Sequence, residues 1–258
     1  MQRFRDILES RTMVHVIAMA NHKGGVAKTS TVSAVGDILA SMGKRVLLVD
    51  LDPQSNLTES LSLRDYDRTV YDAFRERSDL PIFPVKENLD IVPSTIDLAA
   101  AEMELAGTIE RETILADLLE PVLQRYDYIL LDCPPSLGLL TLNALTAATD
   151  LYVPLTPEAL PSRGLQKLLD IVALVRRRLN RNLQLSGIII TIWNGTNLNK
   201  QVETALRERF GDVVFKTRIR KNVSIAEAPL AYQSIVSFAP RSNGAADYSA
   251  LAAEILTR

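Results

Sequence analysis

The stretch Lys23-Gly24-Gly25-Val26-Ala27-Lys28-Thr29-Ser30 decides the fold of this chain. A β-branched run at residues 14–20 precedes it, and apolar residues at helical spacing follow it over residues 29–42. A second buried strand is predicted over residues 45–50. Strand, glycine-rich turn, helix and strand in this order make a βαβ unit, in which the two strands pair in parallel through a right-handed crossover.

The alternation of strands and helices continues along the rest of the chain, and no stretch resembles a linker. It predicts an α/β fold, a doubly wound and mostly parallel sheet with helices on both faces, formed by one domain over residues 13–258 behind an N-terminal extension at residues 1–12. Further strands are predicted over residues 89–93, 128–132, 151–155, 185–191 and 213–215, and further helices over residues 95–106, 112–124, 139–148, 162–179, 198–210 and 245–256.

The composition narrows the classes of protein to which the chain can belong. Of its 258 residues 47% are hydrophobic, which excludes a disordered chain, and the single cysteine, Cys133, excludes an intrachain disulfide. The apolar runs are shorter than the ~20 residues of a membrane span, and the N-terminus lacks the apolar segment of an export signal. We therefore expect a soluble protein of a reducing, cytoplasmic compartment. With 29 Lys+Arg against 31 Asp+Glu, any nucleic-acid partner must contact a local basic patch.

The glycine-rich turn has the chemistry of a phosphate-binding loop. Backbone N–H groups and the helix N-terminus point at the anion, Lys28 reaches the terminal phosphates, and Thr29 offers its hydroxyl to Mg²⁺. The strict GxxxxGK[ST] pattern fails at both glycines, because His22 and Ala27 occupy those positions. Ala27 keeps the backbone donor, and it is tolerable if its φ is negative and strained otherwise.

The eight residues resemble the deviant Walker A box, KGGxGK[ST], of the ParA/MinD class of P-loop ATPases. Residues 46–54 resemble the switch I strand of that class, residues 129–137 its Walker B and switch II segment, and Glu227-Ala228-Pro229 a late element. Within the class, the chain is most similar to the ParA/Soj branch, which partitions chromosomes and plasmids. The resemblance implies ATP and Mg²⁺ as cofactors, an ATP-dependent homodimer and a nucleoid-associated location.

The resemblance also implies roles for single residues. Lys23 is the signature lysine that reaches the partner's nucleotide in an ATP-sandwich dimer, although alone it could be a solvated loop lysine. Asp52 orients the attacking water and helps to hold Mg²⁺, whereas Asp50, on the opposite strand face, is the more structural acid. Asp132 is the Walker B carboxylate, which holds Mg²⁺ through water. The catalytic set is thus Lys23, Lys28 and Asp52, the metal set Thr29, Asp52 and Asp132, and the nucleotide set residues 23–30 with Arg220 and Asn222, which border the adenine pocket.

A basic cluster late in the chain indicates a nucleic-acid contact. In the ParA/Soj branch such residues bind DNA without sequence preference, as phosphate contacts alone allow. Solvated faces are the alternative interpretation, and Arg220 departs from the proline of the family pattern. The predicted DNA-binding residues are Lys216, Arg218, Arg220 and Lys221, and a second arginine group, Arg176 to Arg178 with Arg181, ends a predicted helix.

Three functions remain open from the sequence. The first is a slow ATP hydrolase that partitions DNA with a ParB-like adaptor protein, since no residue is placed as a strong general base. The second is a MinD-like or ParA-like positioning switch for a protein cargo. A membrane-recruited form is disfavoured, because residues 250–258 have the apolar spacing of a core-packing helix. The third is a nucleotide-binding scaffold without turnover, motivated by Ala27.

Overall fold

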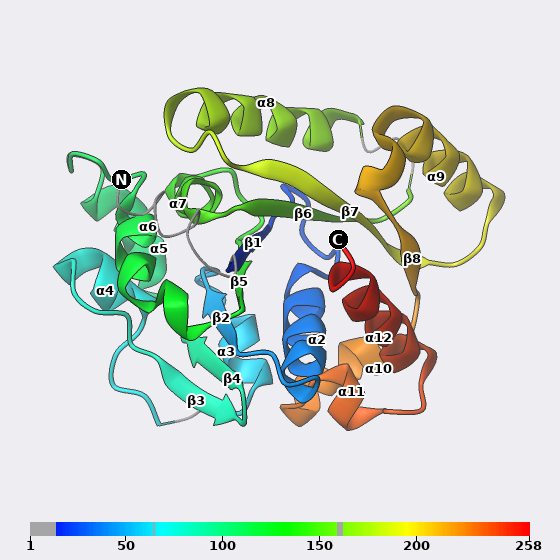
Figure 1. Ribbon diagram of the computed structural model, residues 1–258, viewed down its shortest axis with the longest axis horizontal. Coiled ribbons are helices and arrows are strands. Elements are labelled where there is room, and N and C mark those ends of the chain that lie inside the picture. The colour runs from blue at the N-terminus through cyan, green and yellow to red at the C-terminus, as the bar shows by residue number, and fades with distance from the viewer. Residues whose placement is uncertain (1–13, 64, 159–161) are drawn as a thin grey trace.

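The computed structural model describes residues 14–63, 65–158 and 162–258, which form one eight-stranded sheet with helices on both faces (Figure 1). The strand order is β3-β4-β2-β5-β1-β6-β7-β8, and β3 is antiparallel to β4 whereas the other neighbours pair in parallel. The predicted fold class is therefore confirmed. The predicted N-terminal extension lies outside the described residues.

The elements have the following bounds. The strands are β1 (His15–Met19), β2 (Val46–Asp50), β3 (Phe83–Lys86), β4 (Leu89–Val92), β5 (Tyr128–Asp132), β6 (Asp150–Leu155), β7 (Gln184–Trp193) and β8 (Val214–Arg220). The α-helices are α2 (Lys28–Ser41), α3 (Asn56–Ser60), α4 (Val70–Glu76), α5 (Leu98–Glu104), α6 (Ile114–Leu119), α7 (Leu139–Ala147), α8 (Ser162–Arg178), α9 (Asn197–Phe210), α10 (Val223–Glu227), α11 (Ile235–Phe238) and α12 (Asn243–Ile255). Three short 3₁₀ helices are η1 (Glu120–Arg125), η2 (Gly211–Val213) and η3 (Ala228–Ala231).

Two elements differ from the sequence prediction in an informative way. The helix predicted over residues 112–124 ends at Leu119 and continues as the 3₁₀ helix η1, in which Pro121 lies at the start and has no backbone N–H to donate. The last strand is longer than predicted and runs to Arg220, because Phe215 and Ile219 alternate with exposed residues and bury one strand face.

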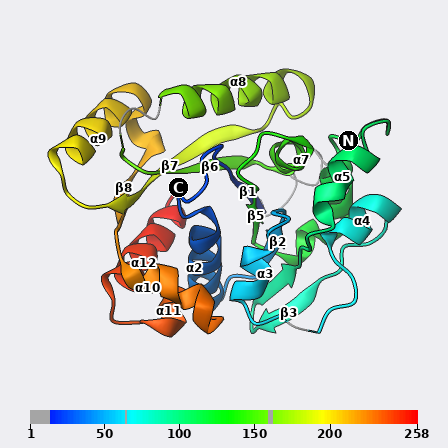
Figure 2. The ribbon, with the colours of Figure 1, turned by 180° about the vertical axis from the view of Figure 1, so that it is seen from behind.

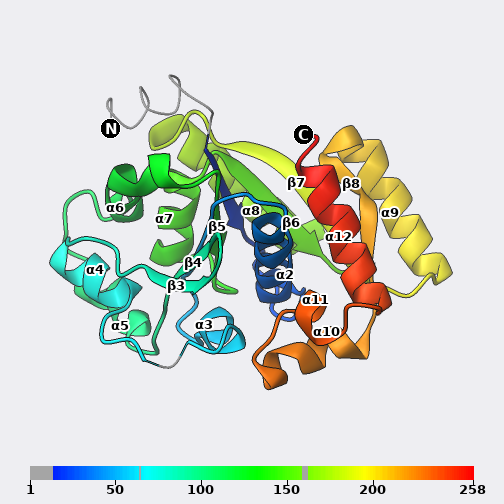
Figure 3. The same cartoon turned by 60° about the horizontal axis from the view of Figure 1, so that its bottom comes forward.

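The strands divide their side chains between two cores. In β1, Val16 and Ala18 face the core that is covered by α4 to α9, whereas Ile17 and Met19 face the core that is covered by α2, α11 and α12. The two layers are visible from the front and from behind, with α8 over one face and α2 over the other (Figures 1 and 2). Turned toward the viewer, α2 and α12 lie side by side (Figure 3).

The carboxyl ends of the central strands meet at one edge of the sheet. Asp132 at the end of β5 is in register with Met19 on β1 and with Asp50 on β2. In the sheet β5 lies between β1 and β2, so the connection from β1 to β2 crosses the position of β5. Strand β6 lies on the other side of β1. Open parallel sheets bind ligands at such a switch point. In the described part of the chain, no helix has the length and apolar character needed to cross a bilayer.

Candidate nucleotide-binding site

The loop between β1 and α2 is fixed to the neighbouring strand β6. The Asn21 side chain donates from Nδ2 to the Pro154 backbone oxygen at 2.7 Å and accepts at Oδ1 from the Lys23 backbone N–H at 3.0 Å. The backbone oxygen of Val26 accepts from the Thr191 hydroxyl at 3.0 Å. The loop therefore starts and turns at positions set by the sheet, with its amides near the N-terminus of α2.

Ala27 adopts the left-handed conformation that a glycine would adopt without strain. Its φ is 64° and its ψ 33°, and Gly25, two residues earlier, has a φ of 70°. Because the φ of Ala27 is positive, the residue is strained. In this region of φ and ψ its Cβ crowds the backbone, at a cost of about 1 kcal/mol. The loop nevertheless keeps the conformation that places Lys28 as the first residue of α2.

The two lysines of the loop point in different directions. Lys28 is 7% exposed, and its Nζ donates to the Lys23 backbone oxygen at 3.4 Å, the one hydrogen bond that the described residues give this ammonium group. Two of its three N–H donors therefore remain for a ligand. The side chain of Lys23 instead reaches Glu158 on its own subunit, with 2.6 Å between Nζ and Oε2.

Asp50 and Asp132 are both fully buried, and they differ in their hydrogen bonds. Asp50 accepts from the backbone N–H of Thr58 at 2.9 Å, from the Thr58 hydroxyl at 2.8 Å and from the backbone N–H of Asp52 at 3.1 Å. Burial outweighs these bonds and raises the pKa of Asp50 to about 6. These contacts hold the segment after β2. They, and not strand alternation, distinguish Asp50 from Asp52, because β2 ends at Asp50 and residues two apart on a strand share a face.

Asp132 has no hydrogen-bond partner at either carboxylate oxygen among the described residues. Burial, followed by the nearby negative charge of Asp50, raises its pKa well above the ordinary value. The Thr29 hydroxyl, which lies near the carboxylate but outside hydrogen-bond geometry, and the positive charge of Lys28 oppose the rise. A buried carboxylate without a partner is costly unless a cation compensates it. Asp132 is therefore the side chain of this site that most needs a ligand.

An open cavity of about 440 Å³ lies beside these residues. Of the predicted nucleotide loop, Gly24, Gly25, Ala27, Lys28, Thr29 and Ser30 line it, whereas Val26 is buried and Lys23 points away. Asp52 lines the cavity as well, is 8% exposed, and accepts at Oδ1 from the Gln54 backbone N–H at 3.0 Å. The structure thus brings the loop and one predicted carboxylate to a common solvent-accessible space.

Other residues of the cavity wall were not predicted. They come from the segment after β2 and from the turn after α10, and include Glu59, Ser60 and the 81%-exposed Leu230. Gln54, Pro135 and Pro229 stand inside the motifs quoted above, so their signal was present in the sequence. The short helix α3, which carries Glu59, has no such signal.

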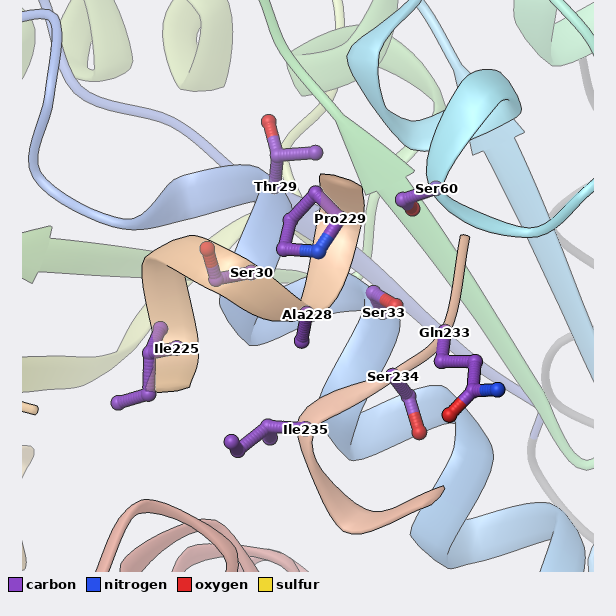
Figure 4. Close-up of a pocket in the computed structure, with 10 residues that line it drawn as sticks. All are labelled: Thr29, Ser30, Ser33, Ser60, Ile225, Ala228, Pro229, Gln233, Ser234 and Ile235. Atoms are coloured by element: carbon purple, nitrogen blue, oxygen red, sulfur yellow. The ribbon is translucent and has the colours of Figure 1, made fainter. Parts of the chain in front are cut away.

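A second, smaller cavity of about 20 Å³ adjoins the first, since Thr29, Ser30 and Ser60 line both. Figure 4 shows side chains from α2, α3 and the α10 to α11 segment around it. The Ser33 hydroxyl is buried there without a hydrogen-bond partner in the described residues. A space of this size holds about one water molecule, which would satisfy that hydroxyl.

Arg220 and Asn222, predicted at the adenine pocket, do not line either cavity. The Asn222 side chain caps α10 by accepting from the Ser224 backbone N–H at 2.8 Å. The Arg220 guanidinium pairs with Asp247, with 2.6 Å between Nη2 and Oδ1. Their contact with a nucleotide remains a prediction.

The predicted DNA-binding residues lie on and just after the edge strand β8, and two of the four have acidic partners. Arg218 pairs with Glu203 at 2.7 Å and lies over the Trp193 ring, and Arg220 pairs with Asp247. Lys216 and Lys221 are exposed and have no ion-pair partner among the described residues. Free positive charge in this cluster therefore rests on the two lysines.

The residues present fit a magnesium ion held mainly by a nucleotide. Among the described residues there is no group of three or more His, Cys, Asp or Glu side chains that could hold a metal alone. Mg²⁺ takes few protein ligands and fills its octahedron with phosphate oxygens and water. The Thr29 hydroxyl, Asp52 and the unpartnered Asp132 supply oxygen atoms of the type that it prefers.

A phosphate-binding loop between the first strand and the following helix, with acids at the ends of β2 and β5, defines a P-loop nucleotide-binding protein. A family model described as an AAA domain matches residues 14–185. The chain is 46% identical to the sporulation initiation inhibitor protein Soj of Bacillus subtilis, over 94% of this chain and 98% of that protein. It is 38% identical to the chromosome partitioning protein ParA of Caulobacter vibrioides, over 96% of both chains.

The chain therefore belongs to the ParA/Soj family of chromosome-partitioning ATPases, as the motifs predicted. Among solved structures, cobyrinic acid a,c-diamide synthase of Mycobacterium smegmatis is similar to it. The TM-score is 0.82 at 35% identity, over 95% of this chain and 94% of the other. That crystal structure holds ADP and magnesium, and another of the same protein holds an ATP analogue and magnesium.

Proposed function

We propose that this protein is a ParA-type ATPase switch. When ATP and Mg²⁺ are bound, two copies of the chain form a sandwich dimer, and this dimer binds DNA without sequence preference. A ParB-like adaptor stimulates ATP hydrolysis, so that the dimer releases DNA. The observation that carries the proposal is the unpartnered Asp132 carboxylate beside a cavity lined by Lys28 and Thr29. The membership of the chain in the ParA/Soj family supports it.

In this proposal the loop residues bind the triphosphate. The amides of residues 24–30 and the N-terminus of α2 face the phosphate oxygens, and the two remaining donors of Lys28 hold the terminal phosphates. Thr29 and Asp52, with Asp132 acting through water, would hold Mg²⁺, which would neutralise charge that develops on the phosphates. The strain at Ala27 lowers the stability of this loop and not the number of its donors.

Hydrolysis is proposed to be slow. Asp52 is the acid proposed to orient a water molecule. It lines the cavity, whereas Asp50 is occupied by three hydrogen bonds and Asp132 is fully buried. Slow turnover suits a switch in which ATP maintains one assembly and hydrolysis ends it. The partner subunit's nucleotide is the proposed target of Lys23, where the ammonium stabilises charge on the transferred phosphate.

The dimer face is proposed to include the rim of the cavity. Leu230 in η3 is 81% exposed, and Pro135 is exposed across the same opening. An apolar side chain this exposed at the mouth of a site is a candidate for burial by a second copy. Lys23 lies in the same loop as the residues that line the cavity, so closure of two copies would bring each Lys23 toward the other cavity.

The experiment that tests the proposed function measures DNA binding with ATP, with ADP and without nucleotide over a salt series. Binding that needs ATP, declines steeply with salt and ignores DNA sequence supports a partition switch. Recovery with anionic vesicles in place of DNA would favour the MinD-like alternative. Phosphate release that is equal for the wild type and for Lys28→Ala would favour a scaffold without turnover.

A further inference from the structure

The Lys23 side chain is held within its own subunit by a contact far away in the sequence. Its Nζ lies 2.6 Å from Glu158 Oε2 and 3.4 Å from the Thr156 hydroxyl, across 135 and 133 positions of the chain. The contact exists because β6, which precedes Glu158, pairs with β1, which precedes the loop of Lys23. The sequence motifs do not predict this ion pair.

Glu158 is positioned by an anchored segment. Asn199 on α9 donates from Nδ2 to the Pro157 backbone oxygen at 2.8 Å, and this bond is buried. Asn21 donates to the backbone oxygen of Pro154 and accepts from the backbone N–H of Lys23, so one asparagine links both sides of the ion pair. The acid and the lysine are therefore held close to each other by the fold.

We propose that Glu158 is a positioning residue that retains Lys23 on its own subunit and has to release it before the ammonium reaches the partner's nucleotide. The inference rests on the proposed cross-subunit role of Lys23. A carboxylate at 2.6 Å and the phosphates of a second subunit compete for one positive charge. The intramolecular ion pair thus opposes dimerisation until ATP is present on both copies.

The exposure of the pair fits a contact that must break. The side chains of Lys23 and Glu158 are 56% and 66% exposed, and exposed ion pairs contribute little free energy and are screened by salt. A symmetric dimer breaks two such pairs, so the effect on its dissociation constant is about 2- to 30-fold. This size tunes the switch without preventing its closure.

The test uses Glu158→Gln, which removes the charge and keeps the size of the side chain. With Mg²⁺ and a nonhydrolysable ATP analogue, sedimentation velocity should give a dimer dissociation constant about 2- to 30-fold lower than that of the wild type at low salt. At about 1 M salt, where the Debye length is about 3 Å, the difference should vanish. Glu158→Asp, which keeps the charge, should restore part of the wild-type value.

Matched controls separate this inference from a general charge effect. Glu76→Gln removes an acid from an exposed pair with Arg68, at 3.0 Å, and should leave dimerisation unchanged. Equal thermal midpoints of the wild type and Glu158→Gln show that the fold is intact.

The outcomes distinguish the two proposals. If Lys23→Ala dimerises like the wild type, the cross-subunit role of Lys23 is wrong, and the role of Glu158 falls with it. If Lys23→Ala fails to dimerise but Glu158→Gln equals the wild type at every salt concentration, or dimerises more weakly, the retaining role of Glu158 is overturned and the dimer proposal stands.

Discussion

Asp132 at the end of β5 is in register with Asp50 at the end of β2, and the two buried carboxylates differ in how they are satisfied. Asp50 accepts three hydrogen bonds from Thr58 and Asp52, whereas Asp132 accepts none within the described residues. One acid of the pair thus builds the segment after β2. Asp132 is instead a buried carboxylate without a partner, whose charged form a cation next to the phosphate loop would stabilise.

Without nucleotide, Asp132→Asn should gain stability relative to the wild type as the pH rises from 5 to 8, since the wild-type carboxylate is buried without a partner and the amide carries no charge. The pKa of Asp132 is higher in the folded state than in the unfolded chain, so the folded state binds the proton more tightly. The penalty is absent at low pH and grows as the pH rises. Thermal unfolding of both proteins at pH 5 and pH 8 checks this, and a gain that does not shrink at pH 5 contradicts it.

Ala27→Gly should raise the free energy of unfolding by about 0.5–1 kcal/mol, because the backbone at this position has a φ of 64°. Thermal denaturation should show a midpoint higher by about 1–4 °C. Gly25→Ala is the matched control: its φ is 70° and a Cβ there would meet no atom within 4 Å, so it should lower the midpoint through backbone strain alone. A lower midpoint for Ala27→Gly would mean that the loop is not strained.

Asp52→Ala should lower ATP turnover by at least about 100-fold while nucleotide binding is retained, because this acid lines the cavity and is the one proposed to orient the attacking water. Single-turnover phosphate release and nucleotide titration measure the two quantities. The contrasting variant is Asp50→Ala, which removes the acceptor of three hydrogen bonds and should lower the thermal midpoint. Wild-type turnover of Asp52→Ala would exclude it from the mechanism.

Lys216→Ala with Lys221→Ala should reduce the magnitude of the salt slope of DNA binding by about 1.8, since each phosphate contact contributes about 0.9. Both lysines are exposed and lack an ion-pair partner in the described chain, so stability should not change. Arg218→Ala should instead destabilise the fold, because it removes a partner of Glu203, whose side chain is 8% exposed. An unchanged slope for the double lysine variant would move the DNA site elsewhere.

Leu230→Glu should prevent formation of the ATP-dependent dimer, because it places a charge at the cavity rim, where the proposed dimer buries the apolar side chain of Leu230. Light scattering with an ATP analogue and Mg²⁺ measures the effect. Met103→Glu on α5 is the control, since Met103 is 78% exposed and lies away from the lining of the cavity. If Leu230→Glu dimerises at the same protein concentration as the wild type, η3 is not part of the interface.

Much of the fold and of the site could be predicted from local patterns. The parallel strands are runs of apolar and β-branched residues. Each predicted site element, namely the phosphate loop, Asp52 and Asp132, comes at the end of such a run or directly after it in the sequence. The strand β3 was missed because Pro84 and Lys86 interrupt its apolar pattern, which an antiparallel edge strand tolerates.

Contacts between distant residues could not be predicted in the same way. The pairs of Lys23 with Glu158 and of Arg220 with Asp247 form only when the sheet places their elements together. The left-handed φ of Ala27 is likewise set by the fold, since the loop has to turn between β1 and α2. The acidic partners of Arg218 and Arg220 could not be predicted for the same reason, because they lie on other elements.

The most direct test is a crystal structure with Mg²⁺ and a nonhydrolysable ATP analogue. We expect the triphosphate to lie in the loop of residues 23–30 with Lys28 on its terminal phosphates. We expect each Lys23 to be released from Glu158 and to contact the nucleotide of the other copy. An empty loop, or two copies that each close their own site with Lys23 still on Glu158, would contradict these expectations.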